Sequence, residues 1–583
     1  MRAKLFFLLI LLFSSSILRA DVTPVLQRTG KTFDPAIPTI QSVLGYDFGE
    51  RITRHADMEK YLTALSTSVP NMKVIKIGET WEGRSLYYVI ISSPENMVRL
   101  EELRQANLRL ADPRKISGSD ADAIISKNPV FVGLTYSVHG NEHSGVEAGL
   151  AMAYYLLACK DAETTDLLKN TVVIIDPMQN PDGRERFINY FYQTVGIKPN
   201  ADLNAAEHNE AWPDGRYNHY LFDMNRDWTI VTQPETKARI AAYQQYQPQV
   251  WIDAHEMGEN SNYFFPPPST PRNPNVPTSE IEWWKILGHT IAADFDKYHI
   301  DYYTDENYDF WYPGYGDSWP TYNGAIAGTF EQGSARGMVV KRRDGITIDY
   351  KDAIFHHFVS SLATVKMASA HRSDKLRDFY NYRSTAVQEG KTGASREYIL
   401  SRTSDPQEAD HLVNQLLIQG IEVRQATADF PLAAHDYLND SAQNITVKQG
   451  DYILSLDQPL KRLINVSFER APAFDKKFLD EEAKRRENHE PTEVYDITAW
   501  ALPLAFNLKA YWSGDVLKSS TQAVTQVDPA IAAPDSSFGY VLNYDTNDAI
   551  AAIYKLLDQN VRVYFARKPF VLAGKSYRTG SFI

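Results

Sequence analysis

The stretch PVFVGLTYSVHGNEHSGVEAGLAMAYYLL, residues 129–157, contains an apolar run, a polar turn and a second apolar run in direct succession. The first run, residues 130–134, predicts a buried strand, and residues 145–157 predict a helix. The turn between them places His139 and Glu142 three positions apart at the end of the strand. Such a pair can bind a metal ion, although a loop histidine beside an acidic residue is more often a solvated ion pair.

Strands and helices alternate along the chain from residue 45 to about residue 375, and this alternation predicts an α/β fold with a sheet covered by helices. Two segments, 106–127 and 265–277, have the composition of surface loops. The strand-like runs are residues 73–77, 86–92, 130–134, 171–175 and 249–252, and the helical patterns are residues 58–68, 145–157 and 233–246.

The two ends of the chain differ in character from this region. Residues 1–20 have the order of a secretory signal peptide, with basic residues, an apolar run and small residues, so we expect an exported protein, periplasmic or extracellular. Residues 21–44 are poorly periodic and predict an extended lead-in. Residues 390–583 contain two strand-helix-strand patterns, which resemble each other only weakly, and predict an accessory C-terminal α/β domain. The apolar ending GSFI suggests the hypothesis that this domain is truncated.

The composition excludes several classes of protein. The 583 residues carry a formal net charge of −13, which argues against a nucleic-acid or anionic-membrane partner. No segment beyond the first twenty residues approaches the length of apolar sequence that spans a membrane. Cys159 is the single cysteine, so no intramolecular disulfide can form. The chain is therefore expected to be globular and stabilised by packing.

Three further stretches carry polar residues at the ends of apolar runs. WIDAHEMG (251–258) places His255 as a candidate third metal ligand, the alternative being a histidine buried in the core. Glu331 ends the apolar run 325–330 and suits a general base, with an ion pair to a nearby cation as the alternative. In FDMNRDW (222–228), Arg226 with Asn225 suits a carboxylate-binding pair, whereas most surface arginines are solvated.

These stretches together resemble the zinc carboxypeptidases of peptidase family M14, the carboxypeptidase A group. The resemblance covers residues 45–375 and implies a mixed central sheet flanked by helices. It is carried, in chain order, by EGRSLYYVII at 82–91, H-x-x-E at 139–142, NPDG at 180–183, D-x-N-R at 223–226, His255 and TFE at 329–331.

The resemblance implies a role for each of these residues. His139, Glu142 and His255 would hold one zinc ion per chain, and Glu331 would activate water and carry its proton. Asn225 and Arg226 match the residues that grip the terminal carboxylate of the substrate. Asp223 matches a carboxylate that orients the first histidine, a partner that zinc-bound histidines generally have.

Some positions depart from the pattern of the family. Asn141 stands where pancreatic-type enzymes have an arginine, which weakens any inference about their extended subsite. The arginine that polarises the scissile carbonyl lies between NPDG and D-x-N-R in the family. The segment is unusual here, and Arg216 is our choice over Arg184 and Arg186.

The flexible tyrosine of the family precedes the catalytic glutamate by about twenty residues. Tyr312, Tyr315 and Tyr322 are candidates here, and Tyr312 fits this spacing best, although so dense an aromatic cluster can also form a pocket wall. Asp317 could favour a basic C-terminal residue in the substrate, while Trp319 and Tyr322 could make the pocket aromatic. The side-chain preference stays open.

The leading prediction is an exported zinc metallocarboxypeptidase that acts on peptides or proteins with a free C-terminus. One alternative is a hydrolase of the same fold that trims cell-wall peptides. Another is a noncatalytic peptide-binding protein. The presence of all three metal ligands and of the general base argues against this alternative. The C-terminal domain could shield the active site, bind a polymer or mediate assembly, and the sequence leaves the oligomeric state open.

Overall fold

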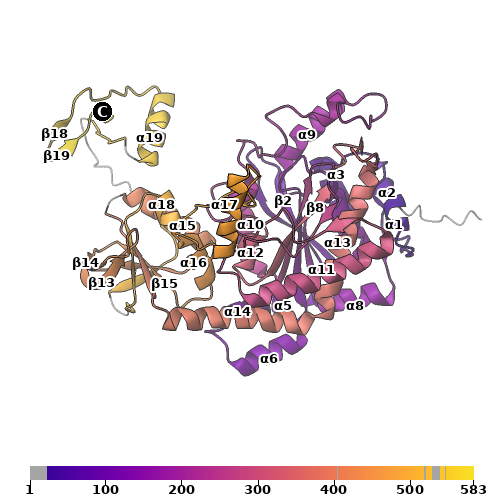
Figure 1. Ribbon diagram of the computed structural model, residues 1–583, viewed down its shortest axis with the longest axis horizontal. Coiled ribbons are helices and arrows are strands. Elements are labelled where there is room, and N and C mark those ends of the chain that lie inside the picture. Colours follow the sequence, from indigo (N-terminus) through magenta and orange to yellow (C-terminus); the bar gives the residue numbers. More distant parts are fainter. Residues whose placement is uncertain (1–22, 404, 518–519, 528–538, 545) are drawn as a thin grey trace, which may run out of the picture.

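The computed structural model describes residues 23–403, 405–517, 520–527, 539–544 and 546–583. Its largest element is an eight-stranded sheet with the order β1-β2-β4-β3-β5-β8-β6-β7 (Figure 1). Strands β4, β3, β5 and β8 are parallel, whereas β1, β2 and β6 introduce antiparallel pairs. The predicted fold class, a mixed sheet flanked by helices, is confirmed. The strands are β1 Met72–Glu79, β2 Ser85–Ile91, β3 Val130–Tyr136, β4 Thr171–Asp176, β5 Val250–Met257, β6 Tyr263–Phe264, β7 Tyr302–Tyr303 and β8 Ile326–Gly333.

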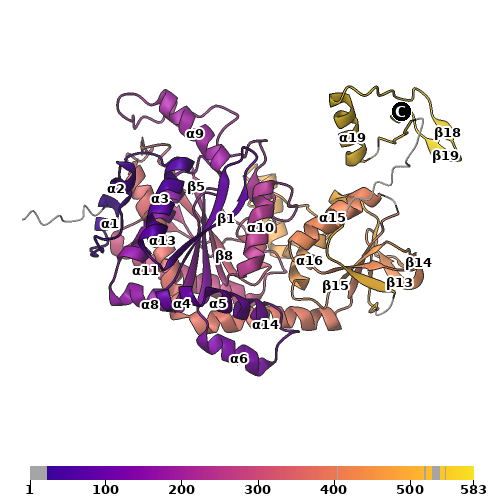
Figure 2. The ribbon, with the colours of Figure 1, turned by 180° about the vertical axis from the view of Figure 1, so that it is seen from behind.

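Helices cover both faces of this sheet (Figures 1 and 2). α7 (Ser144–Ala158), α11 (Thr278–Tyr298) and α13 (Tyr350–Ala370) pack together on one face, and α10 (Pro234–Tyr246) packs on the other. Every residue of α7 is buried, because this helix lies between the sheet and α13. The remaining helices of this region are α3 His55–Ser68, α4 Pro94–Val98, α5 Leu100–Ala111, α6 Gly118–Lys127, α8 Ala162–Asn170, α9 Pro181–Thr194, α12 Ser318–Thr321 and α14 Arg372–Thr392.

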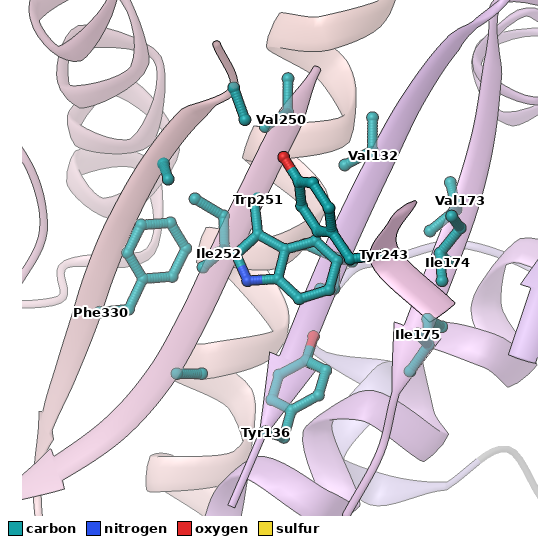
Figure 3. Close-up of a cluster of buried hydrophobic side chains, with 14 of the residues drawn as sticks. Val132, Tyr136, Val173, Ile174, Ile175, Tyr243, Val250, Trp251, Ile252 and Phe330 are labelled. Atoms are coloured by element: carbon teal, nitrogen blue, oxygen red, sulfur yellow. The ribbon is translucent and has the colours of Figure 1, made fainter. Parts of the chain in front are cut away.

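The centre of the sheet is packed by large aromatic side chains. Trp251 on β5 lies over Gly133 on β3, where a Cβ atom would come within 2.2 Å of the indole ring. The Tyr243 ring of α10 lies beside that indole (Figure 3). The two rings pack edge to face with 5.1 Å between their centres. On the opposite face, the Tyr136 hydroxyl bonds to Ser361 of α13 at 2.7 Å. These contacts fix the middle strands, whose ends form the candidate site.

The described part of the segment 21–44 is not extended as predicted. It contains two short helices, α1 (Pro24–Gln27) and α2 (Ile40–Leu44). Thr39 caps α2 by accepting a hydrogen bond from Ser42, and Arg28 after α1 bonds to Asp352 of α13 at 2.6 Å. The segment is too short to show a hydrophobic period. Its conformation is decided by the packing of α1 against α13 and of α2 against α3. The predicted signal peptide, residues 1–20, lies outside the described residues.

The loop predicted at residues 106–127 is also wrong, because this segment completes α5 and forms α6. Ser117 caps α6 by accepting a hydrogen bond from the Asp120 amide. Asn107 is fully buried, and its side-chain amide donates to the carbonyls of Tyr246 and Gln247. Asparagine is typical of loops, but here its hydrogen bonds to the turn after α10 allow it to be buried within a helix.

A second sheet follows α14, with the order β14-β13-β16-β11-β15-β12-β17 and antiparallel pairing throughout. Its helices include α15 (Pro406–Ile418) and α16 (Lys461–Phe468). The boundaries 45–375 and 390–583 stay predictions. The other elements are β11 Glu397–Leu400, β12 Val423–Ala426, β13 Phe430–Asp436, β14 Ala442–Val447, β15 Tyr452–Ser455, β16 Ala510–Ser513, β17 Thr521–Val524, α17 Lys476–Glu487, α18 Leu502–Ala505 and α19 Asn547–Asp558, with small hairpins β9–β10 (Val339–Lys341, Thr347–Asp349) and β18–β19 (Phe570–Leu572, Lys575–Tyr577).

The two sheets are joined by buried polar contacts as well as by the chain. Gln419, just after α15, accepts a hydrogen bond from the Trp319 indole at 2.9 Å and donates to the Thr229 carbonyl at 3.2 Å. Its own carbonyl accepts from Gln244 of α10 at 2.6 Å. Across the described ranges, no helix is both long enough and apolar enough to cross a membrane.

Glu280 of α11 gives a testable pH dependence of stability. It is fully buried 3.5 Å from Lys375, and burial raises its pKa from 4.5 to about 7. As the pH rises, Glu280 loses its proton in the unfolded chain at a lower pH than in the folded protein. The free energy of unfolding therefore falls by about 3 kcal/mol between about pH 4.5 and pH 7. Glu280→Gln should remove this part of the pH dependence in urea unfolding at pH 5 and pH 8. The exposed neighbour Glu282, changed to Gln, should leave the dependence as it is.

Candidate active site

The candidate site lies where three neighbouring parallel strands end. β3, β5 and β8 are adjacent in the sheet, so their carboxyl ends meet at one edge. His139 follows β3, His255 lies on β5, and Glu331 lies on β8 directly opposite His255 in the register. The sheet thus brings together residues that are far apart in the sequence.

The turn after β3 is held against the NPDG motif. A Cβ atom at Gly140 would lie 2.1 Å from the Arg184 amide nitrogen, so only glycine fits beside this backbone. Asn180 accepts a hydrogen bond from the Gly183 amide and so caps α9. Its side-chain nitrogen also donates to the Arg216 carbonyl at 3.1 Å. The motif therefore positions both the first histidine and a candidate catalytic arginine.

His139, Glu142 and His255 form a group whose ligand atoms all lie within 4.8 Å of one another. The Nδ1 atom of His139 lies 2.6 Å from Glu142 Oε1, and the Nδ1 atom of His255 lies 2.9 Å from Glu142 Oε2. Burial alone would raise the pKa of Glu142, but both histidines lower it, and the net shift is downward. Two imidazoles and one carboxylate are the donor set of catalytic zinc sites, so these residues fit a zinc ion.

Each histidine is oriented by a carboxylate on its other nitrogen. Nε2 of His139 lies 3.1 Å from Asp223, and Nε2 of His255 lies 3.0 Å from Asp253. Asp223 was predicted from the sequence, and Asp253 was not. Because side chains two positions apart on a strand share a face, the spacing of Asp253 and His255 was the available signal.

Glu331 is almost fully buried at the same edge, and its Oε2 atom has no hydrogen-bond partner among the described residues. Burial raises its pKa to about 8, with the Glu142 carboxylate adding to this effect and His255 and Arg216 opposing it. A buried carboxylate with an unpartnered oxygen, facing a potential metal site, is suited to hold and release a proton.

Of the three candidate arginines, the structure brings Arg216 to the site. Its guanidinium donates to Asp223 at 3.0 and 3.1 Å and lies 3.5 Å from Glu142. Arg184 is fully buried in an ion pair with Glu147. Arg186 donates to the carbonyls of the 214–218 segment. Arg216 is therefore the one of these three that lines the pocket with the histidines.

Asn225 and Arg226 line the same pocket. Asn225 accepts a hydrogen bond from the Gly316 amide at 2.7 Å, which fixes its side chain near His255. The Arg226 guanidinium lies 4.6 Å from the ring centre of Tyr315. The cation is thus held in place by an aromatic face and points into the pocket.

The tyrosine prediction needs correction. Tyr312 is buried with its hydroxyl donating to the Arg226 carbonyl at 3.0 Å, and it is not among the described residues that line the pocket. Tyr308 and Tyr315 line it instead. Tyr308 was not predicted, although it precedes Glu331 by 23 residues. Tyr495, which follows α17, also lines the pocket. Its distance in the sequence from the other pocket residues means that no motif spacing could have predicted it.

The pocket beyond the candidate metal site has apolar walls and includes the carboxyl groups of Asp317 and Asp309. Asp317 lines it and accepts a hydrogen bond from Thr329 at 2.9 Å, and burial raises its pKa. Burial also raises the pKa of Asp309 to about 6. Trp319 and Tyr322 are fully buried and do not line this pocket, so an aromatic lining by these two is wrong. The walls come from Phe264, Pro266, Pro268, Trp284, Tyr308, Phe310 and Tyr315.

Comparisons with known proteins show which family this part of the chain resembles. Residues 58–343 match the family model described as zinc carboxypeptidase. Carboxypeptidase D of Homo sapiens is 28% identical over 253 residues, which cover 39% of this chain and 15% of that protein. Carboxypeptidase D of Rattus norvegicus is 28% identical over 235 residues, covering 37% of this chain and 14% of that protein. The chain thus matches only a small part of the length of these relatives.

Among solved structures, carboxypeptidase A from Helicoverpa armigera is similar, with a TM-score of 0.37 and 16% sequence identity. The match covers 60% of this chain and 78% of that one.

Proposed function

The chain carries a zinc carboxypeptidase domain of peptidase family M14, and we propose that it is a metallocarboxypeptidase that removes residues from the free C-terminus of peptides. One observation carries this proposal: the histidine–glutamate–histidine group, Glu331 and the Asn225–Arg226 pair line a single pocket. We also propose export, on the basis of the signal-like residues 1–20.

We assign one zinc ion to His139, Glu142 and His255. When bound, zinc supplies Lewis acidity that polarises a scissile carbonyl and acidifies water. Asp223 and Asp253 fix the ring orientation of the two histidines, which keeps both Nδ1 atoms directed at Glu142. These partners support a preformed site rather than one assembled on binding.

The remaining residues supply proton transfer and charge stabilisation. Glu331 accepts a proton from the attacking water and delivers it to the amine nitrogen of the departing residue. The Arg216 guanidinium donates hydrogen bonds to the carbonyl oxygen as negative charge develops on it. Arg226 and Asn225 bind the terminal carboxylate, which selects the last peptide bond of the substrate.

The test is mass spectrometry of products from free-ended peptides, their amidated counterparts and cell-wall muropeptides, each with and without a chelator. We expect loss of single C-terminal residues, faster from free-ended peptides and prevented by the chelator. Cleavage of muropeptides alone would move the assignment to cell-wall trimming. Absence of all cleavage, with peptides still bound, would favour the noncatalytic alternative.

Arg226→Gln should weaken the selection of free C-termini. The variant loses a charge-assisted hydrogen-bonding group, so kcat/KM for free-ended peptides should fall roughly 30- to 200-fold, while amidated peptides change little. Steady-state kinetics on matched peptide pairs measures this. Arg343, which is exposed, gives the control variant Arg343→Gln. An equal loss on both peptide types would contradict a carboxylate-binding role.

A further inference from the structure

A segment from the C-terminal half of the chain, residues 492–500, lies at the candidate active site. It follows α17, which Figure 1 shows in orange between the two sheets. The Tyr495 amide donates to Asp309 at 3.0 Å, and the Tyr495 ring lies 5.5 Å from the ring of Tyr308. The segment therefore contacts pocket residues through both its backbone and its side chains.

Both ends of the 492–500 segment are fixed. At one end the Glu493 amide donates to Glu482 of α17 at 2.9 Å. At the other end the Trp500 indole donates to the Val466 carbonyl at 2.7 Å and packs 5.8 Å from Tyr312. Phe474, which precedes α17, stacks on Trp311 at 3.9 Å. These contacts present Tyr495 and Asp496 to the pocket in one defined position.

Asp496 is bound to the arginine of the proposed carboxylate site. Its Oδ2 atom accepts a hydrogen bond from Nε of Arg226 at 2.7 Å and lies 2.6 Å from Nη2 of the same guanidinium in an ion pair. Arg226 Nη1 donates to the Asn225 carbonyl at 3.1 Å. Asp496 thus faces the Nε–Nη2 edge of the guanidinium, so one edge that could bind a carboxylate bidentately is occupied.

The contact is a carboxylate bound where the substrate's carboxylate is expected. The Asp496 side chain is 37% exposed and that of Arg226 is 21% exposed, so a ligand can reach the pair. Asp223 lies 3.9 Å from Arg226 on its other side, which further reduces the positive potential offered to an anion.

We propose that Asp496 is a specificity-determining residue that competes with the C-terminal carboxylate of the substrate for Arg226. A free-ended peptide must displace Asp496 or share the arginine with it, which weakens the binding of such peptides relative to amidated ones. A residue from the C-terminal half of the chain thereby influences which substrates bind at the site formed by the N-terminal sheet. This inference rests on the carboxylate-binding role of Arg226 in the proposed function.

The test uses Asp496→Asn in the full-length, zinc-loaded protein. Asparagine keeps the shape of the side chain and removes its charge, so KM for a free-ended peptide should fall about three- to tenfold. The change should appear in KM rather than in kcat, and the matched amidated peptide should show no change in KM. Glu490→Gln is the control, since it removes the same charge from an exposed position just before the segment.

Binding measurements separate failure of this inference from failure of the proposed function. Calorimetry with the free-ended and amidated peptides is run on wild type and on Asp496→Asn, whether or not the protein cleaves them. Tighter binding of the free-ended peptide alone supports competition by Asp496 even if no peptide is cleaved. Equal affinities for both peptides in both proteins overturn the inference even if cleavage is observed. Asp496→Ser, as a second variant, must give the same direction of change.

Discussion

Glu331→Gln is expected to lower kcat by about 10²- to 10⁴-fold while one zinc ion per chain stays bound. The amide cannot accept a proton from water, but it has nearly the same shape, and Glu331 is not one of the three proposed ligands. Stopped assays on free-ended peptides measure the rate, and metal analysis after gel filtration measures the zinc.

The nearby Glu259 provides the comparison for this variant. It lies outside the pocket in an ion pair with Arg336, so Glu259→Gln should keep its activity within a few-fold of wild type. A Glu331→Gln variant that turns over at the wild-type rate would eliminate the proton-transfer role assigned to this carboxylate.

His255→Ala is expected to lose zinc and, with it, nearly all peptidase activity. The substitution removes one of three ligands and also leaves Asp253, which is fully buried, without its imidazole partner. Dialysis against zinc-free buffer followed by metal analysis should give far less than one zinc ion per chain, where wild type keeps one.

His219 is a matched control, because it is half-exposed and pairs with Glu82 away from the cluster. His219→Ala should bind zinc and cleave peptides as wild type does. Should His255→Ala retain a full zinc ion under the same dialysis, the ligand assignment would have to be abandoned. Circular dichroism of each variant separates loss of zinc from loss of folding.

Several parts of the site could be predicted from the sequence because their signals are local. His139, Glu142, His255 and Glu331 each follow or end an apolar run, and in an α/β sheet such positions gather at one edge. For these four residues a short stretch of sequence contains both the strand and the side chain at or beyond its end. Asp223 and Arg226 are not at a strand end, and their places at the site were implied by the resemblance of D-x-N-R to the zinc carboxypeptidases.

Other parts could not be predicted because they depend on contacts between distant segments. No local sequence pattern distinguishes the role of Arg216 from that of Arg184. Only the tertiary structure shows that Arg184 is buried in an ion pair with Glu147. Tyr312 fits the spacing, yet its hydroxyl turns to the Arg226 carbonyl. Residues 106–127 read as a loop because the partners of Asn107 lie 139 and 140 positions away.

The sequence by itself determined the α/β class and the chemistry available at the strand ends, because hydrophobic period and residue type act over a few positions. Only the tertiary structure decided which arginine and tyrosines face the pocket and that Asp496 binds Arg226 across 270 positions. The composition of the stretch 495–506 is typical of core strands and a helix. Its first residues instead lie at the candidate active site. The position of such a segment depends on the distant surface against which it packs, and no local sequence pattern specifies that surface.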